Sequence, residues 1–380
     1  MIPRIESLNL IEGYLEVFPV VILTGPRQCG KTTLAKEILL KRGGHFFDLE
    51  DPDTALRAEI AKTVLEDLEG LIVIDEFQKQ PALFELIRVL ADRKPSKARF
   101  LILGSASPSI VKGASESLAG RAGFIELGGF TLEEVGYEMA KQLWIRGGFP
   151  RSYLSTTEAL SYTWRESFVT AFLERDIPQL GIRIPEATLR RFWRMVAHFH
   201  GKLWNAAEFA KALNTKENTA RHYLDILTGS FMLRQLPPWF ENLGKRLVKS
   251  PKIYLSDTGI LHTLLGLRSF EDVLAYPNFG FSWEGFAIDQ IIRIFEAQKD
   301  AYFYKTHSGA ELDLLIVKGN QRYGFEFKFE DAPSTTKSMH SVMADLQLEK
   351  LYVVYPGKKH YPLSDKIELI SIEHINKDIL

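Results

Sequence analysis

Residues 25–32 read Gly-Pro-Arg-Gln-Cys-Gly-Lys-Thr, and this octet constrains the fold more than any other stretch of the chain. An apolar run at 20–23 precedes it and a helix-like segment at 34–40 follows it. Glycines near both ends let backbone N–H groups curl around phosphate oxygens, and the helix that follows points its positive end at the same anion. The order predicts a nucleotide-binding α/β fold, with a glycine-rich structural turn as the alternative.

The side chains of this loop predict how it holds nucleotide and metal. Lys31 can reach the β- and γ-phosphates, and the Thr32 hydroxyl can bind Mg²⁺. The other predicted nucleotide contacts come from the same stretch of chain and are Gly25, Pro26, Arg27, Gln28, Cys29, Gly30 and Thr33.

Two acids, Asp75 and Glu76, follow an all-apolar run at 71–74 that is typical of a strand buried on both faces. Ligands of such folds bind at the carboxyl edge of the sheet, so we expect both acids beside the loop. An aspartate there can hold Mg²⁺, and a neighbouring glutamate can deprotonate the attacking water. The pair favours nucleotide hydrolysis over binding alone. Two surface acids after a core strand are the alternative.

Composition and charge exclude several classes of protein. The chain has 380 residues, of which 46% are hydrophobic and 25% charged, as in globular proteins of about two to four domains. Its net charge of −1 requires any nucleic-acid surface to be local, and its single cysteine, Cys29, excludes an internal disulfide. No apolar stretch approaches the ~20 residues that span a bilayer, and no signal-peptide core is present. We therefore expect a cytoplasmic protein without membrane contact.

Residues 1–135 alternate strand and helix signals, which implies a parallel sheet covered by helices. Residues 136–200 read as mostly helical, with a glycine-rich break at 147–150, and are predicted to form a lid over the nucleotide. The predicted strands are 19–24, 45–49, 71–75, 99–104 and 122–127, and the predicted helices between them are 31–42, 53–67 and 81–93.

Two further residues near strand ends are candidates for the nucleotide site. Ser105 follows the apolar run at 100–103 and can contact the γ-phosphate or the attacking water, with a serine-rich turn as the alternative. Arg121 precedes the strand at 122–127 and can reach a neighbouring subunit's phosphate as an arginine finger. That role requires a homo-oligomer, and a solvated arginine is the alternative.

Residues 201–262 have the order of a helix-turn-helix followed by a β wing. Asn205 can cap a first helix, a second helix follows at 217–227, and strand-like runs follow at 231–236 and 252–256. Lys and Arg outnumber Asp and Glu between 211 and 252, a local excess that can face DNA phosphates. A winged helix used only for packing or protein contact is the alternative. The predicted DNA contacts are Lys216, Asn218, Arg221, His222, Lys245, Arg246 and Lys249.

A second group of acids lies in the last quarter of the chain, where 311–317 and 323–329 read as a β-hairpin. Glu326 and Lys328 project from one face of their strand, and the hairpin brings Asp313 alongside. Two carboxylates can hold Mg²⁺ while a lysine positions water, and Glu284 is a further candidate ligand. This spacing is that of PD-(D/E)xK nucleases, with a charged strand face as the alternative.

With these residues in hand, nearly the whole chain resembles the prokaryotic AAA+-type ATPases that carry a C-terminal domain similar to PD-(D/E)xK nucleases. The resemblance implies ATP as the nucleotide, a central winged helix and a restriction-endonuclease-like α/β domain at the end of the chain. It implies little about the biological task. The stretches that carry it are 25–33, 47–53, 71–77, 118–121, 147–150, 173–177, 254–259 and 308–313.

The sequence thus predicts a Mg²⁺-dependent ATPase with a core at 1–135, a helical lid at 136–200, a winged helix at 201–262 and a nuclease-like domain at 263–380. Lys31, Glu76 and Arg121 would serve ATP hydrolysis. Asp313, Glu326 and Lys328 would cut, or at least grip, DNA. Three functions stay open: a DNA-processing ATPase with nuclease activity, a nucleotide-controlled switch whose last domain only binds nucleic acid or protein, and a regulatory scaffold that uses its winged helix for protein contacts.

Overall fold

The computed structural model describes residues 2–54, 56, 60–93, 98–105, 117–240, 247–307 and 309–379. The chain divides into two compact units, one formed by Met1–Gly129 with Gly229–Phe231 and the other by Phe130–Thr228 with Met232–Leu380. None of the described helices combines the length and the apolar composition that crossing a bilayer needs.

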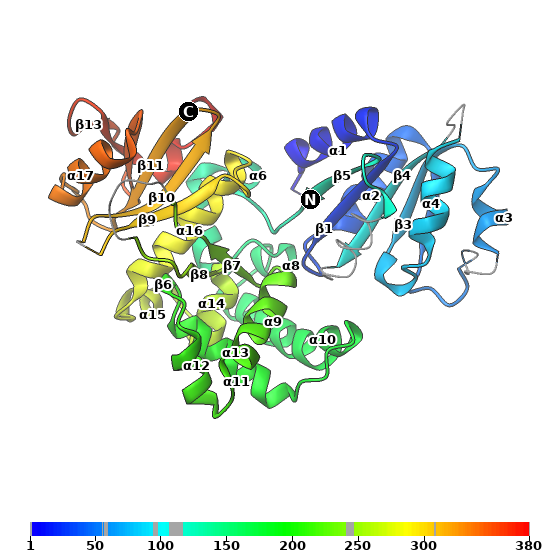
Figure 1. The fold of residues 1–380 in the computed structure, drawn as a ribbon, viewed down its shortest axis with the longest axis horizontal. Helices are drawn as coiled ribbons and strands as arrows, with labels where there is room; N and C mark the ends of the chain where they lie inside the picture. Colours follow the sequence, from blue (N-terminus) through cyan, green and yellow to red (C-terminus); the bar gives the residue numbers. More distant parts are fainter. Residues whose placement is uncertain are drawn as a thin grey trace. The chain divides into compact units, whose positions relative to one another are not determined.

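A five-stranded parallel sheet with the order β2-β3-β4-β1-β5 forms the centre of the first unit, as its sequence predicts. It can be followed in blue and cyan in Figure 1. Its strands are β1 (Val20–Gly25), β2 (Gly44–Asp48), β3 (Gly70–Asp75), β4 (Ala98–Ser105) and β5 (Ala122–Glu126). Its helices are α1 (Ile5–Val17), α2 (Lys31–Arg42), α3 (Ala61–Leu65), the 3₁₀ turn η1 (Phe77–Lys79) and α4 (Leu83–Ala91).

Alternate residues of the central strands face opposite layers of this unit. Ile22 and Ile72 pack in one buried cluster with side chains of α3 and α4. Val21 and Val73 pack in another with side chains of α1 and α2. Both faces are therefore covered, which explains why the strands are apolar throughout rather than alternating.

The helix predicted at 53–67 is shorter in the structure, where α3 covers only Ala61–Leu65. Upstream of it, the carboxylate of Asp48 accepts a hydrogen bond from the backbone N–H of Glu50, and that of Asp51 accepts one from Asp53. Such local side-chain bonds offer the backbone an alternative to helix, so the chain turns here instead.

The second unit begins with a helical region that supplies much of its apolar core. Aromatic side chains of η3, α11 and α12 pack together, with Phe172, Trp193 and Phe209 all buried. The helices are α6 (Leu132–Val135), η2 (Tyr137–Met139), α7 (Ala140–Arg146), α8 (Pro150–Tyr153), α9 (Glu158–Ala171), a π-helical turn η3 (Phe172–Asp176), α10 (Ile177–Gln179), α11 (Glu186–His198), α12 (Ala206–Leu213), α13 (Glu217–Gly229), α14 (Thr258–Leu265) and α15 (Phe270–Ala275).

A small antiparallel sheet with the order β6-β8-β7 is formed by one strand before α12 and two strands after α13. Its strands are β6 (Lys202–Leu203), β7 (Leu233–Leu236) and β8 (Lys252–Leu255). The Asn205 side chain caps α12 by accepting from the backbone N–H of Glu208, and Asn214 ends this helix in a left-handed conformation. The bounds of α12 and α13 agree with the two helices expected from the sequence.

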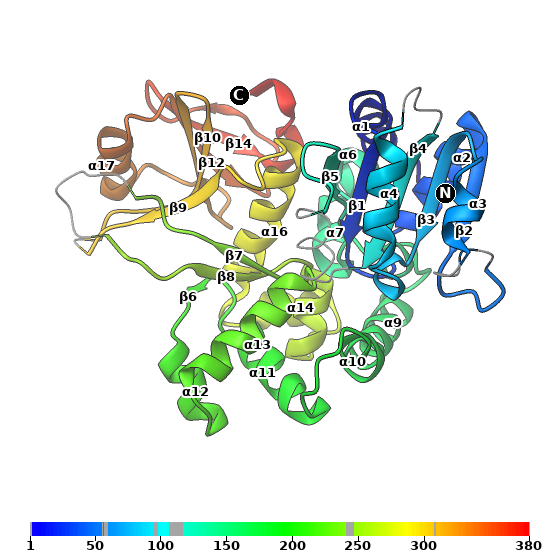
Figure 2. The same ribbon diagram turned by 45° about the vertical axis from the view of Figure 1, so that its right-hand side comes forward.

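A six-stranded mixed sheet with the order β13-β14-β12-β11-β10-β9 forms the rest of the second unit. Helix α17 (Lys337–Leu346) packs on one face of it, and α16 (Phe279–Ile294) runs along it, as Figure 2 shows. The strands are β9 (Ala301–Lys305), β10 (Glu311–Lys318), β11 (Gln321–Phe327), β12 (Lys350–Tyr355), β13 (Tyr361–Pro362) and β14 (Ile367–Ser371), followed by η4 (Ile372–His374) and η5 (Lys377–Ile379).

Candidate nucleotide and carboxylate sites

The loop at 25–32 joins β1 to α2 at the carboxyl edge of the parallel sheet. Its backbone bends through positive φ angles at Gly25 (155°), Gln28 (63°) and Gly30 (104°). A Cβ atom at Gly25 would lie 2.0 Å from the backbone oxygen of Leu127, so only glycine fits at this position. The loop has the shape and the place that phosphate binding requires.

Lys31 lies folded over this loop in the structure. Its Nζ donates hydrogen bonds to the backbone oxygens of Gly25 (3.0 Å) and Pro26 (2.8 Å), and the side chain is buried. A buried ammonium group needs hydrogen-bond acceptors, and these two carbonyls supply them. The ammonium is therefore held where a phosphate group would lie against the loop.

Thr32 and Asp75 come from different elements and meet at the sheet edge. The Thr32 hydroxyl donates to Oδ2 of Asp75 at 2.6 Å, while the other carboxylate oxygen accepts from the backbone N–H of Glu76 at 2.8 Å. Asp75 is 3% exposed, so its charge is held by these bonds rather than by water. A hydroxyl and a carboxylate in contact form a suitable oxygen pair for Mg²⁺.

Glu76 lies directly after β3 with a left-handed backbone (φ 52°, ψ 43°), which turns its side chain away from the strand direction. Its carboxylate accepts from the Gln78 amide and lies 4.0 Å from the Arg27 guanidinium. Burial raises the pKa of Glu76, and Arg27 and Gln78 counteract this only in part. A carboxylate whose pKa is raised is a better proton acceptor, as a general base requires.

Arg4 is a functional candidate that the sequence does not reveal. Its guanidinium is buried and donates to the backbone oxygens of Cys29 (3.0 Å), Gly128 (3.1 Å) and Gly129 (3.1 Å). It thereby ties the phosphate loop to the segment that follows β5. A single arginine at the fourth position of a sequence belongs to no recognisable motif, so only the fold identifies this contact.

Of the remaining predicted residues, Ser105 and Thr33 lie near the loop, whereas Arg121 precedes β5 beside Val20, at the opposite edge of the parallel sheet. Ser105 ends β4 and its backbone pairs in register with Gly25, while its side chain lies outside the described part of the structure. Thr33 is exposed on the first turn of α2. Arg121 forms a two-pronged ion pair with Asp92 of the same chain, through Nε at 2.6 Å and a terminal nitrogen at 2.8 Å.

Comparison with known proteins gives the family. Residues 17–136 match the AAA domain, and two domains of unknown function match residues 137–271 (DUF8612) and 279–375 (DUF4143). Two uncharacterised mycobacterial proteins, Mb2031c of Mycobacterium bovis and Rv2008c of Mycobacterium tuberculosis, are 47% identical over 375 residues, which is 99% of this chain and 85% of theirs. The chain belongs to their family.

A solved structure has a similar fold. The Walker-type ATPase PABY2304 of Pyrococcus abyssi is similar with a TM-score of 0.50 at 14% identity, over 70% of this chain and 96% of that one. At this identity the likeness concerns the fold alone. The AAA match and the loop geometry support an ATPase of the AAA/P-loop type in the first unit of this family member.

In the second unit, the predicted DNA contacts of α13 share an exposed face. Lys216, Asn218, Arg221 and His222 are exposed, while Ala220 and Leu224 of the same helix are buried. Lys249 is exposed as well. Lys245 and Arg246 lie outside the described residues. The structure therefore leaves the predicted face of α13 open to a partner.

The chain between β7 and β8 pairs with the edge of the six-stranded sheet. The backbone N–H of Trp239 donates to Phe303 of β9 (2.7 Å), and that of Phe303 donates to Pro237 (3.0 Å). Val248 donates to Lys305 at the end of the same strand (3.2 Å). Both described ends of this predicted wing thus make protein contacts with the last domain.

The hairpin acids meet a lysine that sequence reasoning assigned to the basic surface. Lys252 of β8 is 4% exposed, and its Nζ lies 3.3 Å from Glu284, 3.1 Å from Glu311 and 3.2 Å from Asp313. It faces carboxylates rather than solvent, so it contributes nothing to the local excess of exposed positive charge. The sequence analysis did not place Lys252 and Tyr254 in this cluster because no spacing rule links β8 to β10. It also left out Glu311, although Glu311 lies two residues before Asp313 on the same strand and therefore on the same face.

The predicted nuclease-like residues are close together in the structure. The β10–β11 register places Asp313 beside Glu326, and Oδ2 of Asp313 accepts from the backbone N–H of Phe327 (3.3 Å). Lys328 lies 3.7 Å from Glu326, and the Tyr254 hydroxyl donates to Glu284. The hairpin and α16 thus bring the predicted residues into one cluster.

Burial and neighbouring negative charge raise the pKa of two of these acids. Burial raises the pKa of Glu284 to about 7, with Asp313 adding to the shift and Lys252 opposing it. Burial and Asp313 also raise the pKa of Glu326 well above its ordinary value. For Lys252, burial lowers the pKa, but Tyr254 and the surrounding carboxylates outweigh burial and raise it. The lysine is therefore charged within the cluster.

These residues do not fit a divalent metal ion as they are arranged. Across the described ranges, no three His, Cys, Asp or Glu side chains are placed to hold one. The oxygens of Glu284, Glu311 and Asp313 that would bind a metal converge on an ammonium group instead.

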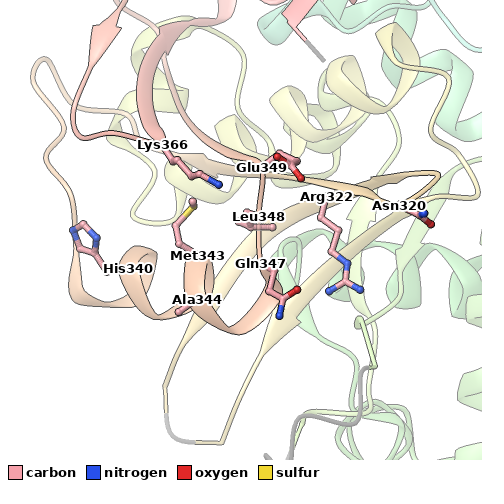
Figure 3. Close-up of a pocket in the computed structure, with 9 residues that line it drawn as sticks. All are labelled: Asn320, Arg322, His340, Met343, Ala344, Gln347, Leu348, Glu349 and Lys366. Atoms are coloured by element: carbon pink, nitrogen blue, oxygen red, sulfur yellow. The ribbon is translucent and has the colours of Figure 1, made fainter.

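A separate hollow lies at the turn end of the β10–β11 hairpin, away from the acids. It has a volume of about 620 Å³, and the Arg, His and Lys side chains that line it are Arg322, His340 and Lys366 (Figure 3). Arg322 is held in place by donating to the backbone oxygen of Leu346 (3.0 Å) and lies over the ring of Trp239. The hollow is polar, and no predicted site residue lines it.

Proposed function

We propose that this chain is a Mg²⁺-dependent ATP hydrolase that couples ATP binding and turnover to DNA binding through α13. The observation that carries the hydrolase part is the contact of Thr32 with Asp75 beside Glu76, at the mouth of the loop that holds Lys31. Binding of ATP with Mg²⁺ would need the loop and Asp75, but it would not need the second acid, Glu76, at the end of β3.

The roles of the residues follow from their positions. Lys31 would exchange the carbonyls of Gly25 and Pro26 for phosphate oxygens, and the loop N–H groups would complete the phosphate contacts. Thr32 and Asp75 would hold the metal. Mg²⁺, when bound with ATP, supplies positive charge at the γ-phosphate. Glu76 would orient the attacking water and accept its proton.

The DNA part of the proposal rests on the exposed face of α13. Lys216 and Arg221 supply positive charge, while Asn218 and His222 can donate to phosphate or base edges. Glu217 lies 3.9 Å from Arg221 in an exposed ion pair, which is weak and easily exchanged for a phosphate. The described ends of the β7–β8 connection are bonded to β9, and we therefore assign DNA contact to α13.

Substitution of Glu76 tests the hydrolase. Glu76→Gln keeps the shape of the site but removes the proton acceptor, so ATP binding should persist while turnover falls about 100-fold or more. Binding is measured by calorimetry and turnover by phosphate release, each with and without duplex DNA. Glu66→Gln, at an exposed acid, is the matched control. Unchanged turnover in Glu76→Gln would refute the assignment of the base.

A second candidate is a nucleotide-controlled switch whose last domain binds nucleic acid or protein without cutting. The position of Lys252 among the hairpin acids favours it. A cleavage assay separates the two: a nuclease would cut DNA with Mg²⁺ or Mn²⁺ and lose this in Glu326→Ala. A switch would cut no DNA form, yet bind differently with ATP and with ADP.

A further inference from the structure

The acids of the last domain are joined to the small sheet by more than one ion pair. Lys252 and Tyr254, both from β8, reach Glu284 of α16. On the neighbouring strand β7, Arg234 lies 3.2 Å from Asp289 of α16, again largely buried. These contacts, together with the pairing to β9 described above, attach both β7 and β8 to the last domain.

The cluster needs a positive charge at its centre. Three carboxylates converge on a single buried point, and carboxylates are not left unpaired in such surroundings. Among the described carboxylates, Lys305 pairs with Glu311 alone, from the half-exposed rim, and Lys328 pairs with Glu326 alone. Lys252 is therefore the cation that faces Glu284 and Asp313 together.

We propose that Lys252 is the resident cation of the Glu284, Glu311 and Asp313 cluster, and that its ammonium group takes the place of a divalent metal ion and excludes it. The acids of this nuclease-like domain thus cannot bind a metal ion while β8 keeps Lys252 among them. Withdrawal of the ammonium leaves clustered oxygen ligands without a counter-charge, which is the ligand set that Mg²⁺ and Mn²⁺ prefer.

Manganese binding to the full chain tests this without reference to activity. Mn²⁺ is titrated in the absence of nucleotide and followed by electron paramagnetic resonance. Wild type and Lys252→Arg should show no Mn²⁺ binding that depends on Asp313. Lys252→Met should bind one Mn²⁺ at least about tenfold more tightly, and the added substitution Asp313→Asn should abolish the gain.

Lys305→Met is the matched control, because it removes an equal charge from the rim but leaves Lys252 in place. It should behave as wild type. A Lys252→Met protein that folds but gains no Mn²⁺ would overturn the proposal, since the lysine would then be an ordinary ion-pair partner.

The wild-type chain decides the matter if Lys252→Met does not fold. If Asp313→Asn and wild type bind Mn²⁺ equally, the wild type has no Mn²⁺ site at Asp313, which would support exclusion of the metal. An Asp313-dependent Mn²⁺ site in the wild type, seen as lost binding in Asp313→Asn, would contradict it.

Discussion

The Thr32 hydroxyl and the Asp75 carboxylate lie 2.6 Å apart, although 43 positions separate them in the sequence. Thr32 lies in the first turn of α2 and Asp75 is the last residue of β3. Strand β4 lies between β1 and β3 in the sheet. The contact therefore depends on the correct sheet order, and it places the two oxygen groups where the loop turns toward its phosphate.

Loss of the Asp75 charge should weaken metal-dependent binding selectively. Asp75→Asn can still accept from Thr32, but it lacks the negative charge that Mg²⁺ needs. We expect affinity for ATP with Mg²⁺ to fall by about 10- to 100-fold. Calorimetry with and without Mg²⁺ measures this, and an equal loss in both conditions would point to misfolding of the loop instead.

Mixing two inactive variants tests whether Arg121 acts on a neighbouring subunit. If it does, Glu76→Gln supplies the arginine and Arg121→Ala supplies the base, so a 1:1 mixture should recover up to about a quarter of wild-type turnover. Arg93→Ala, which removes another exposed arginine, is the control. No recovery in mixed oligomers would confine Arg121 to its pair with Asp92.

Removal of the Arg4 guanidinium should loosen the phosphate loop. Arg4→Met leaves the backbone oxygens of Cys29, Gly128 and Gly129 without this donor, and each buried acceptor left unpaired costs about 1–3 kcal/mol. We expect a lower free energy of unfolding, measured by urea denaturation, and weaker ATP binding. Arg42→Met removes an exposed pair with Glu16 and should change both by much less.

Charge removal on α13 should flatten the salt dependence of DNA binding. Each phosphate contact contributes about −0.9 to the slope of log K against log salt, so Lys216→Ala and Arg221→Ala should each reduce it by about one. Fluorescence anisotropy with a labelled duplex at several salt concentrations gives the slope. Lys299→Ala, at an exposed lysine far along the chain, should leave it unchanged; an equal effect there would argue against α13.

Acid should destabilise the second unit through His262. Burial lowers the pKa of this histidine to about 3, and its ring contacts Ile145 and Ser282. The folded protein holds it neutral, so its contribution is complete above the unfolded pKa of 6.5 and is lost as the pH falls toward 3.

Replacement of His262 measures that contribution. In His262→Gln, the decline of unfolding free energy below pH 6.5 should be shallower by up to about 1.4 kcal/mol per pH unit. Denaturation curves between pH 4 and 8 give the comparison, with exposed His222→Gln as control. Parallel curves for wild type and His262→Gln would show that the ring is protonated in the folded state.

The sequence predicts best what is encoded locally. The loop at 25–32 and the acids after β3 carry their spacing within a few residues, and the β10–β11 register places Asp313 beside Glu326 as expected. The same holds for α12 and α13, whose capping residue and apolar periodicity are read directly from the chain.

Contacts between distant elements could not be predicted in this way. Lys252 precedes Asp313 by 61 positions, and Arg4 precedes Gly128 by 124. From composition, Lys252 looked like part of a basic surface, because a single sequence does not show which lysines are buried. Only the pairing of β8 with β7 and β6 turns it inward.

The described ends of the 237–248 segment pair with β9 through Pro237, Trp239 and Val248, and this has a consequence for handling the protein. β9 is an outer strand of its sheet, and an uncovered outer strand invites another chain to add on through backbone hydrogen bonds. The segment caps it near Phe303 and Lys305. Variants that shorten or loosen this cover should therefore be prone to aggregate, even where their catalytic centre is intact.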